Sequence, residues 1–81
     1  MKTLEQILEY EKAHRHEDGD FGITECKRSI KWQIEFEKKY NKVELSLYTL
    51  LERYVRRANE DKFFNDAMIL ACWELINGKE N

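Results

Sequence analysis

Apolar residues recur along this chain at intervals of three and four, the spacing that places side chains on one face of an α-helix. The pattern predicts four helices, over residues 3–16, 24–40, 43–59 and 62–77. Residues 17–23 break it and hold two of the three glycines, so they are expected to form a loop. Proline is absent, which favours long uninterrupted helices. The sequence therefore predicts an all-α fold.

Several helix ends carry recognisable signals. Thr3 is followed three residues later by Gln6, in the register of a capping box. Asp61 is a suitable N-cap for the last helix, and Gly78 lies just past its carboxyl end. Only residues 41–42 separate the second and third helices. The third helix is therefore expected to pack antiparallel or sharply crossed against the second.

The last predicted helix has an unusually apolar centre. Residues 67–73 are apolar nearly all round the helix, which is typical of a segment surrounded by other elements. With only 81 residues, the chain is long enough for one domain with a thin core. We expect a compact single-domain bundle with the last helix at its centre, packed antiparallel or, alternatively, as a more orthogonal array.

The second predicted helix carries two apolar rows on different sides. One row begins at Cys26 and continues at every fourth residue, and the other consists of Trp32, Phe36 and Tyr40. Either another helix of the same chain covers this second row, or a partner protein does. Leu70 and Trp73 raise the same question, since both lie toward a side of the last helix that also carries polar residues. These five residues are the candidate partner-binding surface.

Charged residues suggest a different surface. The chain has 14 basic and 16 acidic residues, a near balance that argues against a dominant electrostatic mechanism such as nucleic-acid binding. The second helix is expected to turn Lys27 and several other lysines toward solvent. A helix-turn-helix reading remains as the alternative. Its nucleic-acid contacts would come from Lys38, Lys39, Arg53, Arg56 and Arg57.

The residues that could support catalysis or metal binding form no recognisable motif. Cys26 and Cys72 lie within apolar stripes and are expected to be free, buried and unreactive thiols. His14 and His16 are two residues apart, so they do not share a helix face. Glu17, Asp18 and Asp20 complete the group of possible ligands, but their spacing departs from a calcium loop. No metal, cofactor or enzymatic activity is expected.

The amino-terminal residues lack the apolar stretch of a secretory signal, and no apolar run is long enough to cross a bilayer. A cytoplasmic location is therefore expected. In general type, the chain is similar to small inhibitors, immunity proteins and phage accessory proteins. We interpret it as a non-enzymatic protein-binding module that acts on a larger macromolecular partner and is able to form a homodimer.

Overall fold

The computed structural model describes the backbone of residues 1–18 and 20–78, and the side chains of residues 1–14 and 22–78. Within these residues it contains four α-helices, one π-helix and no strand. The elements are α1 (Leu4–Asp18), α2 (Asp20–Phe36), the π-helix η1 (Glu37–Asn41), α3 (Leu47–Glu60) and α4 (Ala67–Ile76). The predicted all-α bundle is confirmed.

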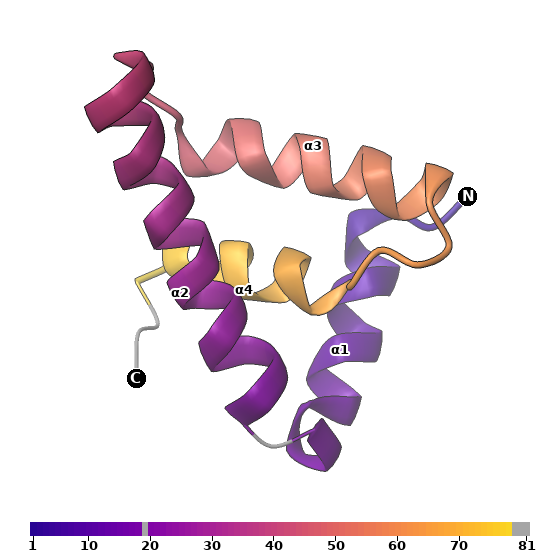
Figure 1. Ribbon diagram of the computed structural model, residues 1–81. Helices are drawn as coiled ribbons and strands as arrows, with labels where there is room; N and C mark the ends of the chain where they lie inside the picture. The colour runs from indigo at the N-terminus through magenta and orange to yellow at the C-terminus, as the bar shows by residue number, and fades with distance from the viewer. Residues whose placement is uncertain (19, 79–81) are drawn as a thin grey trace.

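Helix α4 lies at the centre of the bundle and contacts each of the other three α-helices. Figure 1 shows α1 and α2 as the two arms of a V, with α3 and α4 running across them. This arrangement explains why α4 is apolar around most of its circumference. The predicted central position of the last helix is therefore confirmed. The third helix packs mainly on α4 rather than on α2, which it contacts through the hydrogen bond that the Tyr54 hydroxyl donates to Gln33 at 3.0 Å.

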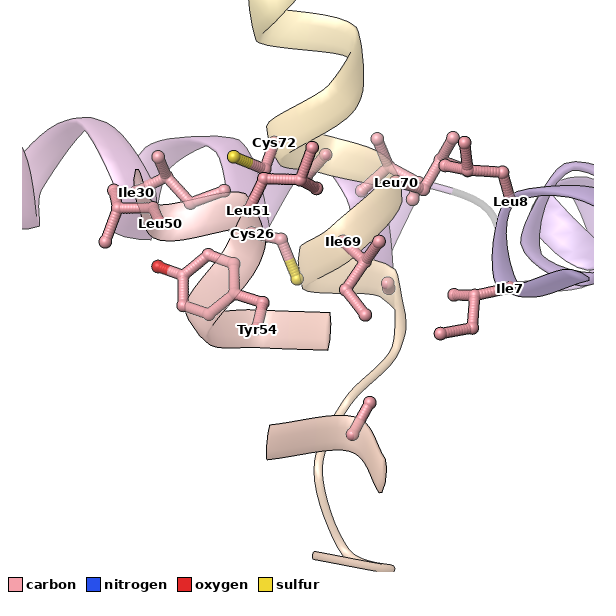
Figure 2. Close-up of a cluster of buried hydrophobic side chains, with 14 residues drawn as sticks. Ile7, Leu8, Cys26, Ile30, Leu50, Leu51, Tyr54, Ile69, Leu70 and Cys72 are labelled. Carbon is pink, nitrogen blue, oxygen red and sulfur yellow. The ribbon is translucent and has the colours of Figure 1, made fainter. Parts of the chain in front are cut away.

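One cluster of buried side chains, drawn from all four α-helices, forms the core. Ile69 and Leu70 of α4 are fully buried, and Figure 2 shows them beside Ile7 and Leu8 of α1. Every α-helix buries a face against this cluster. Burial of apolar area at roughly 25 cal/mol per Å² is the main term that stabilises a bundle of this kind. Removing α4 would therefore expose the buried faces of all its neighbours.

The predicted loop over residues 17–23 is wrong wherever the backbone is described, and Gly19 lies outside the described residues. Helix α1 continues to Asp18 and α2 already begins at Asp20. Gly22 therefore lies within the first turn of a helix. One glycine in a helix costs about 1 kcal/mol. Burial of the neighbouring Ile23, which is 4% exposed, offsets that cost.

Two connections are longer than expected. Residues 42–46 are not helical, and α3 begins only after Ser46, whose hydroxyl accepts a hydrogen bond from the Thr49 amide at 3.0 Å. The predicted start of the third helix at residue 43 is therefore four residues early. Lys42 explains this, because its left-handed conformation (φ 57°) ends the preceding helix.

The second connection covers residues 61–66, so the predicted last helix also begins too early. Asp61 does not cap α4. Its carboxylate accepts a hydrogen bond from the Phe63 amide and its carbonyl accepts one from the Phe64 amide, which closes a turn instead. By contrast, two predicted end signals are confirmed. Thr3 and Gln6 form a reciprocal capping box, and Gly78 adopts a positive φ of 74° after α4.

Candidate functional site

Three aromatic side chains form an exposed row along the end of α2 and η1. Trp32 is 65% exposed, Phe36 37% and Tyr40 63%. The ring centroids of Trp32 and Phe36 lie 5.0 Å apart, and those of Phe36 and Tyr40 lie 4.9 Å apart. Neither α1 nor α4 covers this aromatic row. The sequence left open whether another helix of the chain covers the row or whether it lies at the surface. In the structure the row lies at the surface.

The π-helix aligns the row. In an α-helix, residues four apart are rotated by roughly 40° past a full turn, so a long i, i+4, i+8 row drifts around the cylinder. A π-helix holds more residues per turn, and η1 therefore reverses part of this drift between Phe36 and Tyr40. π-Helical turns occur frequently at functional sites. Here the turn keeps the third ring in contact with the second.

The end of α2 and η1 project beyond α3, as Figure 1 shows at the upper left. A surface groove of about 350 Å³ runs along the aromatic row there, and its other wall is formed by Glu35 and Lys39. The Lys39 ammonium lies 5.4 Å from the centre of the Tyr40 ring. The site thus combines an apolar ladder with one acidic and one basic side chain along a single edge.

Leu70 does not belong to this surface. It is fully buried, because it shares the core-facing stripe of α4 with Ala67 and Ala71. Its predicted role in partner binding is therefore wrong. Trp73 is half-buried, packs against the core and lines a separate groove of about 280 Å³ with Lys12, Glu74 and Asn77. The structure does not bring it into the groove beside the aromatic row.

The basic residues of the alternative site fall into two groups on different elements. Lys38 and Lys39 lie on η1, whereas Arg53, Arg56 and Arg57 occupy the second half of α3. Figure 1 shows η1 near the beginning of α3 and this second half at the opposite end. The Arg57 side chain also turns toward its own neighbours, with its guanidinium 5.8 Å from the Phe64 ring. Within the described residues, these five basic side chains are thus divided between two separate elements.

The two cysteines are buried and free, as predicted. Burial raises the pKa of each thiol from 9.0 to about 11, and the negative charge of Glu11 adds to the effect at Cys26. The Cys72 thiol donates to the Leu47 carbonyl at 3.2 Å, and the Asn65 amide donates to the Cys26 sulfur at 3.7 Å. Because the nucleophile is the thiolate, neither side chain is activated for catalysis.

His14 is engaged locally. Its Nδ1 lies 2.8 Å from the Tyr10 carbonyl, and its ring stacks on Tyr10 with centroids 4.1 Å apart. The other members of the possible ligand group, His16, Glu17, Asp18 and Asp20, have side chains outside the described residues. Among the side chains that are described, no three His, Cys, Asp or Glu residues are grouped so that they could hold a metal ion.

Sequence reasoning missed a group of charged residues inside the bundle. Lys27, expected at the surface, is 7% exposed, and its ammonium lies 2.9 Å from the carboxylate of Glu74, which is 5% exposed. Glu11 on α1 is also buried. Each residue occupies the position that a core stripe assigns to an apolar side chain. Opposite charges at such positions are a signal that periodicity alone could have revealed.

A larger groove, of about 700 Å³, lies between α1 and the 61–66 connection. Its polar lining is already used within the protein. Gln6 takes part in the capping box, the side-chain Oδ1 of Asn65 accepts from the Ala67 amide, and Lys2 pairs with Asp66 at 2.9 Å. This groove therefore offers fewer available polar groups than its volume suggests, and the aromatic row remains the leading candidate.

No protein-family model, curated protein or solved structure significantly matches the chain. In the described part of the chain, no helix combines the length and the apolar character needed to cross a bilayer.

Proposed function

We propose that this chain is a non-enzymatic protein-binding module that docks on a larger macromolecular partner through the aromatic row of Trp32, Phe36 and Tyr40. It acts in the cytoplasm as an inhibitor, immunity-type or phage accessory protein. The observation that carries the proposal is the exposure of three adjacent aromatic rings on one projecting helix end. Tryptophan and tyrosine are enriched at the energetic centres of protein interfaces.

Two further features support this function. The three rings touch one another and are held by a helix rather than by a loop, so little side-chain entropy is lost when a partner covers them. Glu35 and Lys39 border the groove and supply charges of both signs at its rim. Rim charges of this kind contribute to partner choice and association rate more than to affinity. The two free, buried thiols fit a reducing compartment.

The test compares wild-type protein with the Trp32→Glu and Phe36→Glu variants in quantitative pull-downs from cells of the source organism. We expect both variants to lose the partner while their circular dichroism spectra remain helical. Phe63→Glu is the matched control, because Phe63 is 84% exposed on the 61–66 connection, away from the row. The recovered partner is then purified, and its activity is measured with and without the protein. Equal capture by the wild type and both variants would refute the proposal.

The DNA-binding alternative makes an opposite prediction. Binding through Lys38, Lys39, Arg53, Arg56 and Arg57 would weaken steeply with salt as counterions are released. Sedimentation with a random-sequence duplex at low salt measures this directly. The separation of the two basic groups on η1 and α3 gives this alternative less support than the aromatic row has.

A further inference from the structure

We infer that, in the absence of its partner, the aromatic row is covered by the same row of a second copy of this chain, in an antiparallel two-fold arrangement. The symmetry axis passes beside the turn midway between Glu35 and Lys39. The inference rests on the proposed role of the row as a docking surface and specifies what occupies it. It is argued from the charges along the groove and from the area that the rings expose.

Charge complementarity selects a second copy and fixes its direction. Glu35 and Lys39 lie along the same edge of the row, where both line the groove. A two-fold axis midway between them brings Glu35 of each copy opposite Lys39 of the other, so two attractive pairs form at once. A parallel two-fold pairing would place the edge with Glu35 and Lys39 on opposite sides of the interface in the two copies, so these attractive pairs would not form. Only the antiparallel arrangement is self-complementary.

The local structure leaves these charges available. Within the described residues, Glu35 makes no ion pair, and the Lys39 ammonium lies over the Tyr40 ring. Glu37, on the other edge of the helix, is half-buried and accepts a hydrogen bond from Asn41 at 3.2 Å. It is therefore directed along its own helix rather than toward a facing copy.

The exposed area predicts a weak dimer. At the 150–250 Å² that an aromatic side chain can bury, the three exposed fractions correspond to roughly 250–410 Å² per copy. Stable complexes bury about 800 Å² per partner. The rings alone therefore support a weak, transient association rather than a permanent dimer. Such a dimer covers the rings in the free protein, and a partner that binds the row more tightly displaces the second copy.

The experiment is sedimentation equilibrium of the full chain over a concentration series up to about 1 mM. We expect reversible dimerisation for the wild type and none for Trp32→Ser. Lys39→Glu and Glu35→Lys should each raise the dissociation constant about tenfold, because two attractive pairs become repulsive. An equimolar mixture of these two charge variants should dimerise as the wild type does. The double variant E35K/K39E should also dimerise, since it exchanges the two charges without losing complementarity.

Phe63→Ser and Lys62→Glu are the matched controls on the distant 61–66 connection and should leave the dissociation constant unchanged. Circular dichroism verifies that every variant stays folded. A monomer throughout the series overturns the inference, and so does a dimer that is insensitive to Trp32→Ser or to charge reversal at Glu35 and Lys39. A monomeric protein that still loses its partner on Trp32→Glu would refute the dimer alone. A row-dependent dimer whose pull-downs ignore Trp32→Glu would refute the proposed function alone.

Discussion

Lys27 of α2 and Glu74 of α4 form an ion pair inside the bundle, with the ammonium 2.9 Å from the carboxylate and both side chains less than a tenth exposed. The pair joins the two helices that pack most extensively. Desolvation of two charges opposes its formation, so its net contribution to stability is smaller than the direct attraction. Its larger effect is on specificity, because a shifted register of α2 on α4 would leave a buried charge without this partner.

Removing one member of the pair should destabilise the protein strongly. Glu74→Leu leaves the Lys27 ammonium buried without this carboxylate, and we expect the free energy of unfolding to fall by roughly 3 kcal/mol or more. The double variant K27M/E74L should recover most of the loss, because apolar side chains of similar volume replace both charges. Urea unfolding of the two single variants and the double variant measures this. A double variant no more stable than the single ones would contradict the interpretation.

The buried thiols make stability fall in alkali. Above about pH 9 the unfolded chain loses thiol protons that the folded protein keeps until about pH 11. The free energy of unfolding should therefore decrease as the pH rises from about 9 to 11, by at most about 1.4 kcal/mol per pKa unit for each thiol. Urea unfolding between pH 8 and 11 measures the slope. Tyr54, whose pKa is also raised by burial, contributes in the same direction.

Cys72→Ala separates the thiol contribution from that of Tyr54. The variant should show a shallower decline over the same pH interval, whatever its stability at neutral pH. An unchanged slope would mean that Cys72 ionises as readily in the folded protein as in the unfolded chain.

Leu70 and Phe36 should respond in opposite ways to truncation. Leu70→Ala creates a cavity in the core and should cost about 2–5 kcal/mol of stability. Phe36→Ala removes a ring that is already more than a third exposed, and should cost about 1 kcal/mol or less. Thermal unfolding of both variants gives the comparison. Similar losses for the two would indicate that the row is part of the core after all.

Replacing Lys42 with glycine should stabilise the protein. Lys42 has a φ of 57°, a left-handed conformation that glycine adopts without steric cost. We expect a gain of up to about 1 kcal/mol, reduced by the greater freedom of glycine in the unfolded chain. Lys42→Ala is the control, since it removes the side-chain hydrogen bond to the Lys39 carbonyl but keeps the left-handed strain. A lower thermal midpoint for Lys42→Gly than for Lys42→Ala would contradict this account.

The number of helices and the central position of α4 could be predicted from the sequence. A helix that is apolar all round must be surrounded by other elements, and in a small chain only the centre of the bundle provides this. The connections could not be predicted. The periodicity of side chains continues through residues 43–46 and 62–66, and only the backbone at Lys42 and the turn at Asp61 end the helices. Lys27 was predicted at the surface because it is charged. Its spacing indicated burial instead, since it lies three residues from buried Ile30 and four from buried Ile23.

The exposure of Trp32, Phe36 and Tyr40 could not be predicted from the sequence for a related reason. A second apolar row fits either a helix with two neighbours or a helix with one neighbour and a free end. The point at which α2 projects beyond the other helices depends on the angles at which α3 and α4 cross it. The apolar periodicity of a single helix does not encode these crossing angles. The π-helical turn that aligns the rings likewise carries no simple sequence signal.

The central position of α4 also determines when the protein can fold during synthesis. Ribosomes add about 5–20 residues per second, and α1, α2 and α3 all emerge before the helix against which each packs. Before α4 emerges, α1 and α2 can contact each other, but the apolar faces that α4 covers stay exposed and the helices are marginally stable. We expect the core to form when α4 is released, so a nascent chain halted before residue 67 would leave these apolar faces exposed to solvent.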